Sequence, residues 1–247
     1  MSVAEHIAAL DESGRALADA AAAAGLDAPV PTCPGWQVRD LLRHTTMVHR
    51  WAARFVAEGH TSYRPDGGEP QLDGEERLAH FHEGHAALVE ALTKAPADLE
   101  CWTFLPAPSP LAFWARRQAH ETGVHRADAE SALPSGPRPV DATLAVDGID
   151  ELLRAFHARD RSRVRTETTR VLRVRTTDTG DVWTVRLSPD APRTTRTDDG
   201  PADCTLSGPA WQLRLMLWNR LPADAVDIAG DASLAALWRE RSGITWS

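Results

Sequence analysis

The sequence predicts an α+β protein in which a four-helix bundle precedes a smaller domain of mixed strands and helices. Three observations lead to this prediction. Apolar residues recur at helical spacing in four segments of the first half of the chain. A stretch rich in Pro and Gly follows at residues 133–141. Beyond it, β-branched residues flank a short turn, as in a β-hairpin. We therefore expect two domains, at residues 1–135 and 141–247.

The helices of the first domain follow from the apolar periodicity and from its breaks. The first helix is expected to end near Gly25, because glycine commonly terminates helices. Further helices are expected at residues 38–57, 75–95 and 111–132. Polar or Pro-rich loops separate the four segments, so neighbouring helices of the bundle should run antiparallel.

The second domain is expected to begin with a helix at residues 142–159. The runs "TRVLRVRTTD" and "VWTVRLS" around the turn "DTGD" predict a hairpin, and "ADCTLSG" predicts a further strand. A helix should start near Pro209, since proline is favoured in the first turn. A last helix is expected at residues 232–241.

Composition limits the classes of function. The 247 residues carry a net charge of −8, and they include no basic stripe, so nucleic acid is not an expected partner. No apolar run approaches the ~20 residues of a membrane span. Three widely spaced cysteines and an N-terminus without a signal pattern indicate a soluble, cytoplasmic protein. Basic residues are almost all arginine, which suggests a GC-rich source such as an actinobacterium.

Polar residues interrupt the inner face of the fourth predicted helix. Glu121 and His125 are four residues apart, so their side chains share one face of that helix. Trp114, Gln118 and Asp128 follow the same face. A carboxylate and an imidazole placed in this way could bind one divalent metal ion from one side.

The second predicted helix supplies a third ligand. His44 is in register with Leu41 and Val48 and should therefore point into the bundle, where an unpaired polar group is costly. Together, His44, Glu121 and His125 form a candidate metal site that leaves a coordination position open. These ligand types favour zinc, and other first-row divalent ions are compatible with them.

Spacing alone leaves alternatives open. A histidine on an apolar face is often a hydrogen-bonded core residue, and a Glu–His pair at this spacing can be an ordinary helix contact. His85 is a competing ligand, and His49 and His82 are expected near the edges of their apolar stripes. Three arginines flank the ligand pair and are expected off the inner face, facing solvent or the other domain: Arg116, Arg117 and Arg126.

Other chemistries lack their motifs. Val124 stands where a metalloprotease HExxH motif would need its second histidine. The sequence also has no Gly-rich phosphate loop, no paired-cysteine zinc motif and no G-x-S-x-G nucleophile motif.

The stretches "VPTCPGWQVRDLLRHTTMVHRWA" and "WARRQAHETGVHRADAE" resemble the mycothiol-dependent maleylpyruvate isomerase family, within the DinB-like metalloenzyme superfamily. The family pattern is Pro-Gly-Trp, then a helix with a ligand histidine, then a Glu-x-x-x-His pair. Residues 34–36, His44, Glu121 and His125 match it. The resemblance implies that the last three residues bind a divalent metal, usually zinc. The second half resembles the family's C-terminal domain, which is similar to sterol-carrier-protein-2 (SCP2) folds.

The resemblance also implies an activity. A metal-activated thiolate of the cosubstrate mycothiol would add to the cis double bond of an activated diacid, and its release would leave the trans isomer. The alternatives are a mycothiol S-transferase, a metal-dependent hydrolase, or a non-catalytic protein that binds a metal or an apolar ligand. The expected partners are a small-molecule substrate and a low-molecular-weight thiol. The protein is expected to be a monomer or a homodimer.

Further residues receive roles on this basis. Arg220, in the match "WNRLP", is a candidate catalytic cation for a substrate carboxylate, and the alternative is a surface arginine. Asp128, close to His125 on its helix, is expected to accept a hydrogen bond from that imidazole. Three tryptophans are expected near the pocket, although such residues are more often part of a core: Trp36, Trp51 and Trp114.

Overall fold

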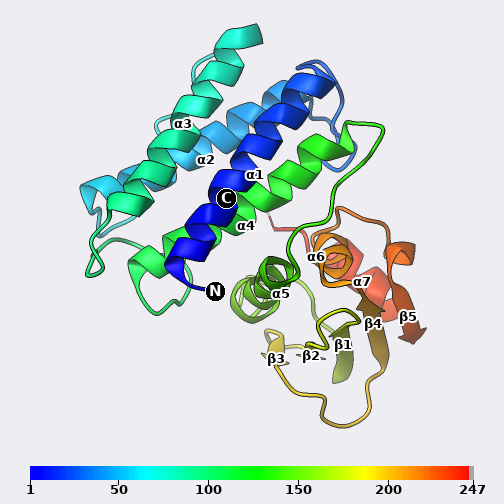
Figure 1. Ribbon diagram of the computed structural model, residues 1–247. Helices are drawn as coiled ribbons and strands as arrows, with labels where there is room; N and C mark the ends of the chain where they lie inside the picture. Colours follow the sequence, from blue (N-terminus) through cyan, green and yellow to red (C-terminus); the bar gives the residue numbers. More distant parts are fainter. Residues whose placement is uncertain (245–247) are drawn as a thin grey trace. The chain divides into compact units, whose positions relative to one another are not determined.

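The computed structural model describes residues 1–244, which divide into two compact units, Met1–Arg138 and a second unit that begins at Pro139. The first unit is a bundle of four helices (Figure 1). The helices lie within a few residues of their predicted positions: α1 (Val3–Ala24), α2 (Val38–Glu58), α3 (Gly74–Lys94) and α4 (Pro110–Ser131). The predicted four-helix bundle is therefore confirmed.

Local signals define the ends of the two helices that carry the candidate ligands. At the start of α2, the backbone N–H of Gln37 donates to the Asp40 carboxylate over 2.9 Å. At the start of α4, Ser109 accepts from the backbone N–H of Ala112 at 3.1 Å, and Pro110 occupies the first turn. Gly59 ends α2 in the left-handed conformation, with φ 61°.

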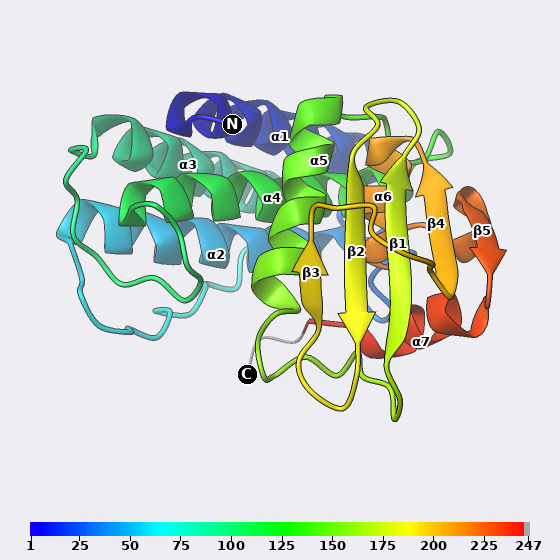
Figure 2. The same ribbon diagram turned by 90° about the horizontal axis from the view of Figure 1, so that it is seen from below.

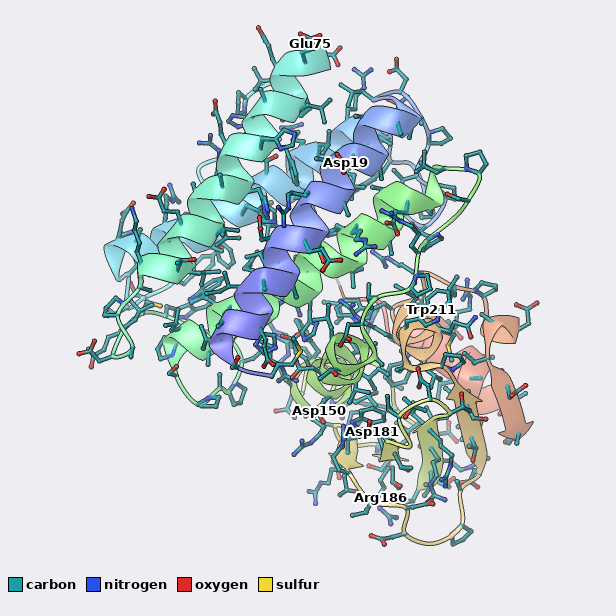
Figure 3. The ribbon with its side chains drawn as sticks, viewed as in Figure 1. Asp19, Glu75, Asp150, Asp181, Arg186 and Trp211 are labelled. Carbon is teal, nitrogen blue, oxygen red and sulfur yellow. The ribbon has the colours of Figure 1, made fainter. Side chains whose placement is uncertain are left out.

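The core of the bundle combines side chains from all four helices. Leu17 of α1, Leu41 of α2, Phe81 of α3 and Ala129 of α4 belong to one cluster, and each is completely buried. Burial of a leucine or phenylalanine contributes about 1.5–3 kcal/mol to stability. Asp19 of α1, labelled in Figure 3, is by contrast exposed. The side chains of α2 and α4 that face one another are thus held by a packed scaffold.

The second unit is a five-stranded mixed sheet with helices on one face (Figure 2). The strand order is β3-β2-β1-β4-β5. Its elements in chain order are α5 (Ala142–Glu151), the π-helical turn η1 (Leu152–Phe156), β1 (Arg170–Thr176), β2 (Val182–Leu187), β3 (Arg193–Thr195), β4 (Cys204–Gly208), α6 (Ala210–Leu217), the 3-10 turn η2 (Ala223–Ala225), β5 (Asp227–Gly230) and α7 (Ser233–Arg241).

The sheet separates an apolar face from a polar face. Trp183, Val185 and Leu187 are buried on β2, whereas Arg186 between them is exposed and is labelled in Figure 3. Successive side chains of a strand point to opposite faces, so the buried set packs against the helices. The α+β class predicted for the whole chain is confirmed.

Pairing in the second unit confirms the hairpin and adds to the prediction. Strands β1 and β2 are antiparallel, as predicted, and β1 also pairs with β4 in parallel. The edge strands β3 and β5 were not predicted. The helix expected at residues 142–159 is regular only to Glu151 and then continues as the π-helical turn η1. Among residues 1–244, no helix combines the length and apolar character that a membrane span requires.

Candidate metal centre

Helices α2 and α4 pack against each other and bring the three predicted ligands together (Figure 2). His125 Nε2 lies 3.2 Å from Glu121 Oε1, and His44 Nε2 lies 3.7 Å from the same oxygen. One ligand atom from each residue lies within 4.8 Å of the others. Ligand atoms about 2.0–2.1 Å from a tetrahedral zinc ion are about 3.3 Å apart. The spacing of the donor atoms therefore fits a single ion of this size.

Burial makes the site asymmetric. The side chains of Glu121 and His125 are 8% and 9% exposed, whereas that of His44 is 20% exposed. Solvent thus reaches the histidine on α2 more easily than the two groups on α4. A site bound by three protein groups and accessible from one side matches the arrangement of catalytic rather than structural zinc sites.

Asp128 contacts His125 as the sequence predicts. Its Oδ2 lies 2.9 Å from Nδ1 of the imidazole, and the Asp128 side chain is fully buried. Because a carboxylate accepts hydrogen bonds, the proton of this pair belongs on Nδ1, and Nε2 is left to face Glu121. The hydrogen bond therefore orients the His125 imidazole with Nε2 toward Glu121.

Arg117 holds the other oxygen of the Glu121 carboxylate. Its Nη2 donates to Glu121 Oε2 at 3.1 Å, and the arginine is 1% exposed. The expectation that Arg117 lies off the inner face is therefore wrong. Arg117 precedes Glu121 by four positions, the same spacing that places Glu121 beside His125. The i, i+4 rule applied to Glu121 could therefore have predicted this contact from the sequence. With Oε2 engaged by Arg117, Oε1 is the oxygen that faces both histidines.

The ionisation of the ligand residues reflects these contacts. Burial opposes the positive charge of His125, but hydrogen bonds to Asp128 and Glu121 outweigh it and raise the pKa of the imidazole to about 9. Burial also disfavours the charged form of Glu121, yet hydrogen bonds from His125 and His44, with Arg117 nearby, hold its pKa well below the ordinary value. In the absence of a cation the pair is thus an imidazolium beside a carboxylate.

The histidines left open as alternative ligands lie elsewhere in the bundle. His49 is completely buried, not at the edge of its stripe as predicted, and its Nε2 lies 2.8 Å from the hydroxyl of Thr122. Burial, with His85 nearby, holds the pKa of His49 well below its usual value. His85 stacks on Phe81 and lies 3.4 Å from Asp11. His82 is exposed. None of these three belongs to the cluster of His44, Glu121 and His125.

The predicted tryptophans fall into two groups. Trp36 contacts the site, with its ring centroid 5.2 Å from that of His44. Trp51 and Trp114 instead contact one another, with ring centroids 5.3 Å apart, in an aromatic cluster with Phe55 and Trp102. The indole N–H groups of Trp51 and Trp114 donate to backbone carbonyls. Their contacts are those of a core, the alternative that the sequence left open.

Arg220 belongs to the second unit, where it follows α6. The Arg220 guanidinium donates to the backbone carbonyl of Trp218 at 2.9 Å. The backbone N–H of Arg220 donates to the backbone carbonyl of Leu215. Asn219 before it has φ 60°, a left-handed conformation that asparagine tolerates better than most residues. The catalytic role of Arg220 stays a prediction.

The chain matches known proteins over almost its whole length. Residues 7–130 match the family profile described as the mycothiol maleylpyruvate isomerase N-terminal domain, and residues 143–237 match the MDMPI C-terminal domain. Two solved structures, the mycothiol-dependent maleylpyruvate isomerase and a point mutant of it, are similar in fold, with TM-scores of 0.57 and 0.64. Each is 11% identical to this chain, and each match covers 93% of both chains.

A "UbiJ-SCP2 Ubiquinone synthesis protein" also matches, with a TM-score of 0.30 and 23% identity, over 42% of this chain and 94% of its own. No curated protein matches the sequence.

Proposed function

Because the chain belongs to the mycothiol maleylpyruvate isomerase family, we propose that it is a metal- and thiol-dependent enzyme. His44, Glu121 and His125 would bind one divalent ion, for which their ligand types favour zinc. The observation that carries the proposal is that both histidine Nε2 atoms face the same Glu121 oxygen, at 3.2 and 3.7 Å.

The residues around the ligands support a catalytic site. Asp128 orients His125, and Arg117 fixes the carboxylate of Glu121. Hydrogen bonds to neighbouring residues thus hold two of the three proposed ligands in place. His44 is the most exposed of the three side chains, at 20%, so solvent reaches the proposed site from its side. A bound cation would supply stabilisation of a thiolate, which is the nucleophilic form of a thiol.

The proposed reaction is a cis–trans isomerisation of an activated alkene diacid such as maleylpyruvate. The thiolate forms a carbon–sulfur bond at the double bond, and the displaced electron pair moves onto the conjugated carbonyl oxygen. Rotation about the resulting single bond follows. The electron pair then returns, the carbon–sulfur bond breaks, and the thiolate leaves with the trans product. Atoms and charge balance without any oxidant or reductant.

Turnover assays with and without mycothiol test this proposal. Zinc-loaded protein should convert maleylpyruvate to its trans isomer only when mycothiol is present, and the His44→Ala variant should not. A covalent mycothiol adduct of the substrate as final product would favour the S-transferase alternative. Isomerisation that proceeds at the same rate without any thiol would contradict thiol dependence, and cleavage of the substrate without thiol would favour a hydrolase.

A further inference from the structure

A tight turn between α1 and α2 lies against the candidate metal centre. The backbone N–H of Trp36 donates to the carbonyl of Cys33 at 3.0 Å, with Pro34 and Gly35 between them. Gly35 has φ 87°. Proline followed by a residue with positive φ is the pattern of a type II turn, which needs glycine at the second of these positions. A second hydrogen bond, from Val30 N–H to the Trp36 carbonyl at 2.9 Å, closes the loop.

This turn reaches His125 on α4 through a carboxylate. The hydroxyl of Thr32 donates to Asp128 Oδ1 at 2.6 Å, while Oδ2 of the same carboxylate bonds to His125 Nδ1. The two oxygens of Asp128 are thus held by different partners, and the carboxylate cannot rotate without losing one of them. Thr32 also lies 3.2 Å from the hydroxyl of Ser131, near the end of α4.

The same turn reaches His44 on α2 through an aromatic contact. The indole of Trp36 meets the imidazole of His44 at an interplanar angle of 60°, with centroids 5.2 Å apart. Aromatic rings prefer such edge-to-face contacts, so the indole favours this orientation of the imidazole. Because Gly35 and Pro34 fix the turn, the positions of Thr32 and Trp36 relative to one another are fixed as well.

We propose that the turn at residues 30–36 is a positioning element for the metal centre. Thr32 orients His125 through Asp128, and Trp36 orients His44, so one short segment holds a ligand from each of two helices. Neither Thr32 nor Trp36 binds the ion. The proposal rests on the proposed function, because it assigns a role relative to the metal that His44, Glu121 and His125 would bind.

Metal affinity of a Thr32→Val variant tests the proposal. Valine keeps the shape of threonine but removes the hydroxyl that bonds to Asp128. Loss of a residue that orients a ligand typically weakens metal binding 10–100-fold. Because Thr32 contacts His125 only through Asp128, we expect the affinity for Zn²⁺ to fall about tenfold, at the lower end of this range. Competition with a chelator measures this affinity. Thr32→Ser keeps a hydroxyl and should restore most of the affinity. Thr93→Val, which removes an exposed hydroxyl on α3, should change nothing.

A double-mutant cycle separates positioning from a merely structural role. If Thr32 acts through Asp128, Thr32→Val should cost almost nothing further once Asp128 is alanine. Independent, additive losses in the double variant would overturn the proposal. The Co²⁺-loaded protein gives a second measurement, since a reoriented His125 in Thr32→Val, and a reoriented His44 in Trp36→Leu, should alter the visible absorption spectrum of the ion. An unchanged affinity and spectrum in Thr32→Val would also overturn it.

These outcomes are distinct from failure of the proposed function. If the wild-type protein binds neither Zn²⁺ nor Co²⁺, the metal site itself is wrong. NMR of the metal-free protein then still tests the hydrogen-bond chain: the Nδ1 proton of His125 should be observable in the wild type and exchange faster in Thr32→Val. Equal exchange in the two proteins would refute the part played by Thr32.

Discussion

The raised pKa of His125 predicts that metal binding displaces a proton. Burial opposes the charged imidazole, but Asp128 and Glu121 raise its pKa to about 9 in the metal-free protein. A histidine binds a metal ion only as the neutral imidazole, so below pH 9 each ion has to displace the proton from Nε2 of His125. Binding should therefore tighten about tenfold per pH unit as the pH rises, and level off near pH 9.

The size of the effect follows from the same pKa. At pH 7 the solution is about two pH units below the pKa of the imidazole, so proton competition weakens the apparent affinity about 100-fold. Calorimetric titration with Zn²⁺ in buffers of different ionisation enthalpy measures the protons released. We expect about one proton per ion at pH 7.

A matched variant provides the control. Asp128→Asn removes the negative partner that helps to raise the pKa of His125, so it should release fewer protons at pH 7. Proton release near zero in the wild type, with an affinity that is constant from about pH 6.5 to 8, would refute the reasoning. It would mean that His125 is already neutral before the ion arrives.

The other predictions concern residues around the ligands and in the second unit. Because the pKa of His125 is higher in the folded than in the unfolded protein, protonation of His125 stabilises the metal-free fold. This stabilisation is complete below pH 6.5 and is lost as the pH rises through about 9, so the Tm of the metal-free protein should fall over this window. Arg117→Met should remove one of the two cationic partners of the buried Glu121 carboxylate, leaving His125, and destabilise the metal-free protein by about 1–3 kcal/mol in denaturant titrations, while the exposed Arg15→Met should have little effect. Arg220→Ala should raise KM for a diacid substrate and leave the metal content unchanged, and unaltered steady-state kinetics would leave Arg220 without a catalytic role.

The four helices of the bundle were predictable because the signals that define them lie within each segment of the sequence. Helical periodicity and loop composition located α1 to α4 within a few residues. The candidate ligand set came from the same periodicity, since His44 is in register with apolar residues of α2, and Glu121 and His125 share a face of α4. Choosing His44 over His85 required the resemblance to a family, because periodicity places both inside the bundle.

The remaining features depend on non-local contacts or on weak local signals. Strands β3 and β5 have three and four residues, too few to show an alternating pattern. The parallel pairing of β1 with β4 joins segments about thirty residues apart, and neither sequence specifies its partner. The contact between Thr32 and Asp128 spans 96 residues, so only the folded bundle reveals it. His49 was misplaced because an imidazole on a stripe edge can turn inward to meet a hydroxyl such as that of Thr122.

The central claim is that His44, Glu121 and His125 jointly bind one metal ion, and metal content tests it most directly. Zinc-loaded wild type, after removal of free ion, should retain about one equivalent by elemental mass spectrometry. His44→Ala and His125→Ala should lose it, while His82→Ala, which changes an exposed histidine of α3, should retain it. Full retention by His44→Ala, with loss of the ion in His85→Ala or His49→Ala, would contradict the account.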